Sequence, residues 1–252
     1  MAGDFRRRLK DRETVLGTMI TLPTPSVAEI LANIGFDWLF VDGEHGPIET
    51  TELAGILQAV NNRSACLYRV PEAAEVPIKK ALDLGADGII VPQTNTPEQV
   101  ADVVKWARYA PQGARGVGLA RAHGYGMSFA DYLSKANEQI SVVVQAEHAL
   151  AIENIEKTVQ VEGIDAVLLG PYDLSASLGH TGELDHPAVT QAIDHLTETC
   201  LAAGIPLGVF GVTAGAIRPY IDRGYSLIVA GVDTMLLGTS ATKLLSDLRS
   251  PS

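Results

Sequence analysis

The segment "FVDGEHGP" places acidic groups and an imidazole directly after a strand-like apolar run. Asp42 and Glu44 are separated by Gly43, and His45 is followed by Gly46. Histidine changes its charge near neutral pH and often acts as a general base. Glycines let the backbone turn sharply and leave room for a ligand. The segment is therefore a candidate for proton-transfer chemistry, although a single loop histidine is more often an ordinary surface or core residue.

Two further acids end later apolar runs. Glu147 closes "SVVVQAE", and Asp173 closes "AVLLGPYD", one strand–helix unit further along. Two carboxylates that meet in one site repel each other unless a cation or a proton lies between them. Oxygen ligands of this kind suit Mg²⁺ or Mn²⁺. The alternative is that both acids are solvated or cap the helical patterns that follow them. Position alone leaves both interpretations open.

Arg69 interrupts the apolar run "ACLYRVP". A buried guanidinium needs an anion, which would be a substrate oxygen, a carboxylate of the site or a purely structural partner. None of the lysines stands at the carboxyl end of a strand-like run, where a Schiff-base aldolase would need one. The seven lysines are Lys10, Lys79, Lys80, Lys105, Lys135, Lys157 and Lys243.

The elements that position these residues are strand-like runs that alternate with helical patterns along the whole chain. Most of the runs are continuously apolar, as in a parallel sheet that is covered on both faces. The expected strands are 15–22, 37–42, 65–70, 88–93, 141–147, 166–171, 206–211 and 226–231. Among the helical patterns, 96–110 begins with Thr96 as N-cap, and 186–204 ends at Gly204.

Eight strand–helix units in 252 residues predict an α/β protein with a single (β/α)8 TIM barrel. We expect one domain over 1–252, in which 1–12 form a short N-terminal helix. A doubly wound sheet is the alternative. Barrel enzymes build their sites at the carboxyl ends of the strands. The polar residues found at those ends are Asp42, Glu44, His45, Arg69, Gln93, Gln145, Glu147, Asp173 and Asp233.

The composition limits the partners and the compartment. The net charge is −11 and no basic stripe is present, which excludes nucleic acid and anionic membranes as expected partners. Cys66 and Cys200 form no CxxC pair, which indicates reduced thiols. The N-terminus lacks the apolar core of a signal peptide, and no apolar run reaches the roughly 20 residues of a membrane span. We therefore expect a cytoplasmic protein.

Long ordered motifs make the chain similar to the HpcH/HpaI aldolases, metal-dependent pyruvate aldolases of the phosphoenolpyruvate/pyruvate barrel superfamily. The resemblance extends over nearly the whole chain. It rests on "GFDWLFVDGEHGP", "YRVP", "IKKALDLGADGIIVPQ", "YAPQGARGVG", "VVVQAEHALAIENI" and "GIDAVLLGPYDLSASLG".

The resemblance implies a role for each site residue. Glu147 and Asp173 match the metal-binding carboxylates, and Arg69 matches the residue that stabilises the enolate. His45 matches the catalytic base, and Asp83 matches the acid that raises the basicity of that histidine. The substrate-binding positions implied are Arg69, Gln145, Gly170, Pro171, Tyr172 and Asp173.

The activity implied is reversible cleavage of a 4-hydroxy-2-oxo acid to pyruvate or hydroxypyruvate and an aldehyde, through an enolate that a divalent metal stabilises. Mg²⁺ or Mn²⁺ is the expected metal, with Co²⁺ as a further option. The resemblance also implies a homo-oligomer, often a hexamer, in which a C-terminal helix packs on a neighbouring subunit.

Three departures from the family pattern bear on the substrate. Tyr172 replaces a small residue, His148 follows Glu147 where a small or polar residue is usual, and "TMITLP" lacks an aromatic residue. The alternatives are an acyl-CoA lyase of the citramalyl-CoA or malyl-CoA type, a phosphate-binding isomerase or synthase, and a non-catalytic barrel that binds 2-oxo acids. A CoA thioester would require a basic cleft, and the acidic chain shows none.

Overall fold

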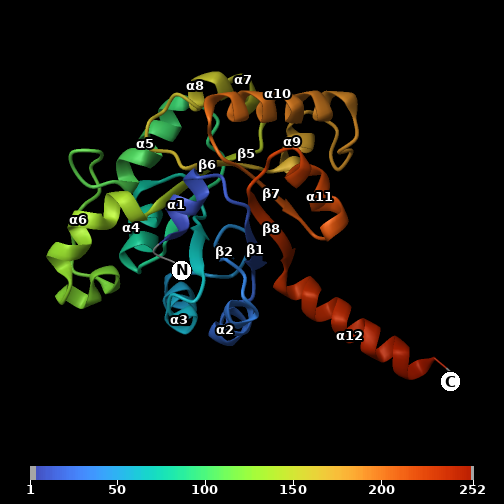
Figure 1. The fold of residues 1–252 in the computed structure, drawn as a ribbon, viewed down its shortest axis with the longest axis horizontal. Coiled ribbons are helices and arrows are strands. Elements are labelled where there is room, and N and C mark those ends of the chain that lie inside the picture. Colours follow the sequence, from blue (N-terminus) through green and yellow to red (C-terminus); the bar gives the residue numbers. More distant parts are fainter. Residues whose placement is uncertain (1–3, 251–252) are drawn as a thin grey trace.

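The computed structural model describes residues 4–250 and contains a closed barrel of eight parallel strands (Figure 1). The strands follow chain order around the barrel, and each pairs with the next, β1 closing against β8. This topology confirms the predicted (β/α)8 barrel. The strands are β1 (Val15–Ile20), β2 (Trp38–Asp42), β3 (Ala65–Arg69), β4 (Gly88–Val91), β5 (Ser141–Ala146), β6 (Ala166–Leu169), β7 (Leu207–Gly211) and β8 (Leu227–Val232).

All eight predicted strands are present, but several end earlier than the apolar runs suggested. The clearest case is β4, which stops at Val91 although the run was expected to continue to 93. Pro92 has no N–H to donate to a sheet ladder. Gln93 then adopts a left-handed backbone with φ of 53°, which a strand does not accommodate.

Helices cover the outside of the barrel. They are α1 (Phe5–Lys10), α2 (Pro25–Ile34), α3 (Thr50–Val60), α4 (Glu75–Asp83), α5 (Pro97–Ala107), α6 (Phe129–Gln139), α7 (Ala149–Glu153), α8 (Ile155–Thr158), α9 (Pro171–Ser177), α10 (Pro187–Ala203), α11 (Ala214–Asp222) and α12 (Asp233–Arg249). Thr96 caps α5 by accepting the Gln99 N–H, and Gly204 ends α10 with φ of 80°, as predicted. No helix within residues 4–250 is long and apolar enough to cross a membrane.

The core has two layers. One fills the space between the strands and the surrounding helices, and the other fills the barrel interior. Helix α1 lies within the predicted segment 1–12. Its Phe5 and Leu9 side chains belong to the interior layer with Trp38, so the helix closes one end of the barrel. A side chain at Gly17 would lie 2.6 Å from the Trp38 indole, which explains a glycine in the middle of β1.

Most of the segment between α5 and α6 is irregular. It also contains a short 3-10 helix, η2 (Arg121–Gly126). His123 of this segment is buried against Phe129 and Tyr132 of α6. Its ring bonds the backbone of the same loop, at Gly118 and Ala120.

Candidate active site

The site is built around a buried ion pair between neighbouring strands. Asp42 of β2 stands opposite Arg69 of β3 in the parallel register. The Asp42 carboxylate accepts hydrogen bonds from Arg69 Nε and Nη2, both at 2.8 Å. Bidentate pairs of this type fix the guanidinium plane. Arg69 Nη1 remains directed into the site, 3.0 Å from the Glu44 carboxylate and 3.5 Å from Gln145 Oε1.

Asp42 also shapes the loop that follows its strand. The carboxylate accepts the backbone N–H of Glu44 at 3.0 Å and that of His45 at 3.3 Å. A side chain at Gly43 would overlap the ring of Tyr68, so the turn requires glycine. One buried acid therefore orients both the arginine and the loop that carries the histidine.

Glu147 lies just beyond β5 and is buried. One of its carboxylate oxygens accepts the backbone N–H of Gln93 at 2.8 Å, and the other accepts the side-chain amide of Gln145. The left-handed backbone at Gln93 turns that N–H toward the acid. A side chain at Gly170 would lie 2.7 Å from Glu147 Cβ, so glycine is needed here as well.

Negative charge exceeds positive charge in the site. Burial raises the pKa of Glu147 to about 7, and the nearby charges of Glu44 and Asp173 act in the same direction. Burial also raises the pKa of Glu44. Arg69 is the cation in contact with these acids, and Asp42 already occupies two of its nitrogens. Carboxylates left without a counter-charge are what a divalent cation binds, and their oxygens suit a hard metal.

A cavity of about 310 Å³ opens beside these groups. All six predicted substrate-binding residues line it, and His45 lies at the same cavity. The rest of its wall is largely apolar. The lining residues are Met19, Thr21, Phe40, Asp42, His45, Arg69, Gln145, Leu168, Leu169, Gly170, Pro171, Tyr172, Asp173 and Phe210. An apolar pocket with a few convergent polar groups is typical of a site for a small molecule.

His45 is at the rim of this cavity. Its side chain is 69% exposed, and Nε2 lies 3.9 Å from the Glu44 carboxylate. Asp83, the expected partner of His45, instead ends α4 and pairs with Arg115 at 2.7 Å. No contact between Asp83 and His45 is found within the part of the chain described. The role of Asp83 as a partner of His45 therefore remains a prediction. Within a single chain, the Asp83 carboxylate pairs with Arg115.

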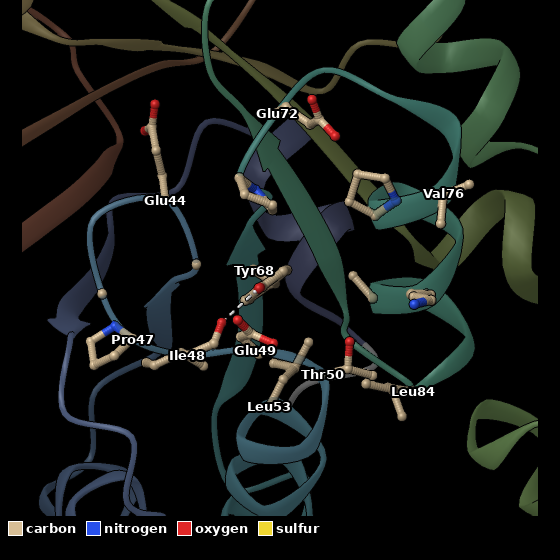
Figure 2. A pocket seen from close by; sticks show the side chains of 16 residues that line it. Glu44, Pro47, Ile48, Glu49, Thr50, Leu53, Tyr68, Glu72, Val76 and Leu84 are labelled. Atoms are coloured by element: carbon tan, nitrogen blue, oxygen red, sulfur yellow. Dashed lines mark hydrogen bonds between the residues drawn. The ribbon is translucent and has the colours of Figure 1, made fainter.

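A second cavity, of about 430 Å³, lies on the other side of Glu44 (Figure 2). The Tyr68 hydroxyl, which would be its most reactive neutral group, already donates to Ile48 O at 2.8 Å. Figure 2 shows the Glu44 side chain at the edge of this cavity, directed away from Tyr68 and Ile48. Arg69, Gln145 and Asp173 line only the first cavity, which we therefore take as the active site.

Two contributions to the site were not anticipated from the sequence. The first is the pairing of Asp42 with Arg69, which strand register alone decides. The second is the set of partners of Asp233, which the sequence indicated only as a polar strand end: it accepts the backbone N–H groups of Thr21 and Leu22 and the Thr21 hydroxyl at 2.8–3.0 Å. Asp233 thus holds the loop after β1 at the cavity, where Thr21 forms part of the wall.

Comparison with known proteins places this geometry in a family. Residues 17–239 match the model of the HpcH/HpaI aldolase/citrate lyase family. A hydroxypyruvate/pyruvate aldolase of Cupriavidus necator is 40% identical, and the match covers 97% of this chain and 92% of that protein. A 4-hydroxy-2-oxovalerate aldolase of Rhodococcus jostii is also 40% identical, over 95% of this chain and 93% of its own length.

Comparison with solved structures supports the same family assignment. An HpcH/HpaI aldolase/citrate lyase family protein from Burkholderia cenocepacia superposes with a TM-score of 0.94 at 35% identity, covering 98% of this chain and all of that one. The protein is a lyase of the aldolase type, and dependence on a divalent metal is general in its family. The match over nearly the whole chain confirms the resemblance drawn from the motifs: this chain belongs to the HpcH/HpaI aldolase/citrate lyase family.

Proposed function

We propose that the protein reversibly cleaves a 4-hydroxy-2-oxo acid into an aldehyde and either pyruvate or hydroxypyruvate. The observation that carries this proposal is the shared cavity, whose lining includes Arg69, Gln145, Asp173 and His45. Relatives at 40% identity are named as aldolases for hydroxypyruvate, pyruvate and 4-hydroxy-2-oxovalerate.

Arg69 supplies fixed positive charge for the enolate oxygen. Its guanidinium plane is held by Asp42, so little reorganisation is needed when negative charge develops on the substrate. Preorganised donors of this kind stabilise a transition state more than mobile ones do. Gln145 lies next to Arg69 and Glu147, where its amide can orient the carboxylate of a 2-oxo acid.

His45 is the proposed base. Aldol cleavage requires that a proton leave the 4-hydroxyl group, and condensation requires that it return. The imidazole faces both the cavity and solvent, so it can pass this proton to water. Glu44, 3.9 Å away, would stabilise the imidazolium formed.

Glu147 and Asp173 are the residues we propose as holders of the family's divalent metal. Their ligand atoms are hard oxygens, which favour Mg²⁺ or Mn²⁺, with Co²⁺ also acceptable. A bound cation would supply Lewis-acid stabilisation of the enolate oxygen. Asp173 stands in the first turn of α9, and the Glu147 side chain packs against Gly170 at the start of that helix.

The aldehyde half of the substrate would lie against the apolar wall. Tyr172 is 58% exposed at the cavity edge, where the family pattern has a smaller residue. The Tyr172 ring narrows this side of the cavity, which favours short aldehydes as products of cleavage. Acyl-CoA is a weaker candidate substrate, because the residues lining the two cavities include several acids and, as bases, only Arg69, His45 and Lys80. A barrel that only binds 2-oxo acids would not need a base at the rim.

We also propose that the protein forms a homo-oligomer through α12. This helix projects away from the barrel, with its C-terminal end far from the other helices (Figure 1). Leu237, Leu244 and Leu248 share one face of the helix and are 62–76% exposed. Leu16 of β1 is also exposed, as expected where a covering helix is missing. A cytoplasmic location remains our expectation from the sequence.

The decisive experiment is an assay for pyruvate and hydroxypyruvate release across a panel of 4-hydroxy-2-oxo acids. We expect cleavage that is lost after chelation and restored by Mg²⁺, Mn²⁺ or Co²⁺. Matched controls are Glu147→Gln and Asp173→Asn, which remove the ligand charge with little change of shape and should not be rescued by metal. Undiminished cleavage by a verified metal-free preparation would show that the reaction does not require a metal held by Glu147 and Asp173.

A further inference from the structure

A second cluster of metal-ligating side chains lies outside the active site, in the loop that joins α9 to α10 (Figure 1). His180, Glu183 and His186 each offer one ligand atom, and these atoms all lie within 4.8 Å of one another. Neither the aldol chemistry nor the packing of the core uses these three groups.

The backbone of this loop explains the clustering. The Glu183 N–H donates to His180 O at 2.9 Å, and the His186 N–H donates to Glu183 O at 3.0 Å. These bonds close two successive turns, 180–183 and 183–186, which bring the three residues close together. Gly182 adopts a left-handed φ of 81° within the first of these turns, and Gly179, with φ of 82°, directly precedes His180.

The loop is also tied to the helix that carries Asp173. The His180 N–H donates to Ser175 O at 2.8 Å, and the Gly182 N–H donates to the Ser175 hydroxyl at 2.9 Å. Ser175 is buried in α9. The cluster is therefore held in place by main-chain bonds and does not depend on the chance positions of surface side chains.

The two imidazoles lie side by side in a loop that lacks lysine and arginine. Their rings stack, with centroids 3.4 Å apart and planes inclined by 17°. His180 Nδ1 lies 3.9 Å from the Glu183 carboxylate. Residues 178–186 contain two acids and no lysine or arginine, so the local charge favours a cation.

We propose that His180, Glu183 and His186 form a second metal site, selective for Zn²⁺ or a similar borderline transition metal. Two imidazole nitrogens and one carboxylate oxygen are a ligand set that Zn²⁺ prefers, whereas the oxygen-only pair at Glu147 and Asp173 prefers harder ions. Three protein ligands leave a coordination position for water. The two sites would therefore prefer different metals, because one offers imidazole nitrogens and the other offers only hard oxygens.

Binding requires two small adjustments within the loop. One imidazole must rotate about χ2, a torsion with broad preferences, so that both nitrogens converge on one ion. His186 also caps α10, because its Nδ1 accepts the Ala188 N–H at 3.2 Å. Coordination through Nε2 would place the imidazole proton on Nδ1 and release this cap. Zinc would then exchange one backbone hydrogen bond for a cross-link within the loop that joins α9 to α10.

The test is a Zn²⁺ titration of the whole protein in saturating Mg²⁺, which keeps the active-site acids occupied. We expect one Zn²⁺ per chain at micromolar affinity, together with a rise in the melting temperature. His186→Asn should lower the affinity at least tenfold, because asparagine retains helix capping but removes the imidazole. His180→Gln should have the same effect. His195→Ala is the matched control, since His195 is also a surface histidine beside an acid, Glu156, but has no second imidazole.

The results would separate this site from the aldolase site. Zn²⁺ binding that survives Glu147→Gln but fails in His186→Asn would assign the ion to the loop, whatever the outcome of the pyruvate assay. The proposal would be overturned if Mg²⁺-saturated protein took up no zinc at micromolar concentration. It would also be overturned if His180→Gln and His186→Asn bound zinc as the parent protein does.

Discussion

At the scale of single residues, the site separates a group that stabilises the enolate from a group that moves a proton. Arg69 is buried and locked by Asp42, whereas His45 is largely exposed at the rim. Decarboxylation of oxaloacetate generates the enolate by loss of CO₂ and needs no base, but aldol cleavage must deprotonate a hydroxyl group. The two reactions should therefore respond differently to substitutions at the two residues.

We predict that Arg69→Ala depresses both reactions by about 10²–10³, the usual loss when a preorganised donor to an oxyanion is removed. His45→Ala should impair aldol cleavage while leaving much of the decarboxylation intact. Steady-state rates for both substrates, with metal content measured in parallel, provide the check. Equal losses of both activities in His45→Ala with metal still bound would mean that His45 builds the site and does not transfer the proton.

The absence of a catalytic lysine gives a second prediction at this scale. Lys80 lines only the cavity beside Tyr68, and no lysine lines the active-site cavity. Treatment with pyruvate and borohydride should therefore leave the protein mass unchanged, since an imine requires a neutral amine at the substrate carbonyl. Intact-mass spectrometry provides the measurement, and a lysine-dependent aldolase treated in the same way is the positive control. A reduced pyruvyl adduct on any lysine would contradict the proposed reaction.

The sequence was informative about which residues are polar at strand ends and silent about their partners. Arg69, Gln145, Glu147 and Asp173 could be found because polar side chains are rare at the ends of apolar runs. The Asp42–Arg69 pair depends on the register between two strands, which no local pattern contains. Asp83 was assigned through the resemblance alone, and within one chain its carboxylate pairs with Arg115.

At the scale of elements, one device recurs before alternate strands. Asp37, Asp87 and Asp165 precede β2, β4 and β6, in the sequence stretches "GFDW", "GADG" and "GIDA". Each carboxylate accepts a backbone N–H from the preceding strand, at Leu16, Cys66 and Val142, within 2.8–2.9 Å. These aspartates pin each strand to its predecessor at the end opposite the active site. The strand patterns were predictable, but this clamp was not, because it joins residues far apart in sequence.

The three aspartates differ in their counter-charges. Asp165 is buried and pairs with both Arg6 and Arg108 at 2.8 Å. Asp87 forms no such ion pair in the described chain, and burial raises its pKa to about 6. A carboxyl group whose pKa is higher in the folded than in the unfolded state lowers stability as pH rises between the two values. The penalty from Asp87 is thus small near pH 4 and complete above pH 6.

We predict that Asp87→Asn raises the melting temperature at pH 8, because the amide oxygen still accepts the Cys66 N–H and the buried charge is gone. The gain should disappear near pH 4. Asp165→Asn, the matched change at the equivalent position, should instead lower stability by about 3 kcal/mol, since it leaves the buried Arg108 guanidinium and the half-buried Arg6 guanidinium without their anion. Thermal unfolding across this pH range tests both. A loss of stability in Asp87→Asn at pH 8 would show that its charge is compensated in solution.

At the scale of the whole molecule, the barrel is complete but its last helix is not packed against it. The alternation of eight apolar runs with helical patterns was enough to predict closure, since consecutive parallel units have few other arrangements. The direction of α12 could not be predicted in that way. An amphipathic helix covers its own barrel or a neighbouring one with the same apolar face, and the local pattern is identical in the two cases.

The exposed face of α12 is too apolar for a free surface. Leu237, Leu244 and Leu248 form a continuous stripe, and monomeric proteins rarely leave such stripes in contact with water. Leu16 on β1 marks uncovered barrel surface that a second copy could protect. The charge of −11 opposes non-specific association, so a contact between copies must rely on this complementary apolar face.

We predict that the double substitution Leu237→Glu and Leu244→Glu converts an oligomer into monomers, measured as a fall in mass by light scattering coupled to size-exclusion chromatography. Two carboxylates on the stripe would have to be buried without partners, which costs more than the contact gains. Ser246→Glu is the control, because residue 246 lies on the opposite face of the same helix and adds one of these charges without touching the stripe. Its mass should equal that of the parent protein.

A parent protein that is already monomeric, or a double variant that keeps the parent mass, would show that α12 does not hold the assembly together. If aldolase activity were lost together with the fall in mass, a neighbouring copy would be needed to complete the active site. A partner for His45 would then be sought on that neighbouring copy, since the Asp83 of its own chain does not contact it.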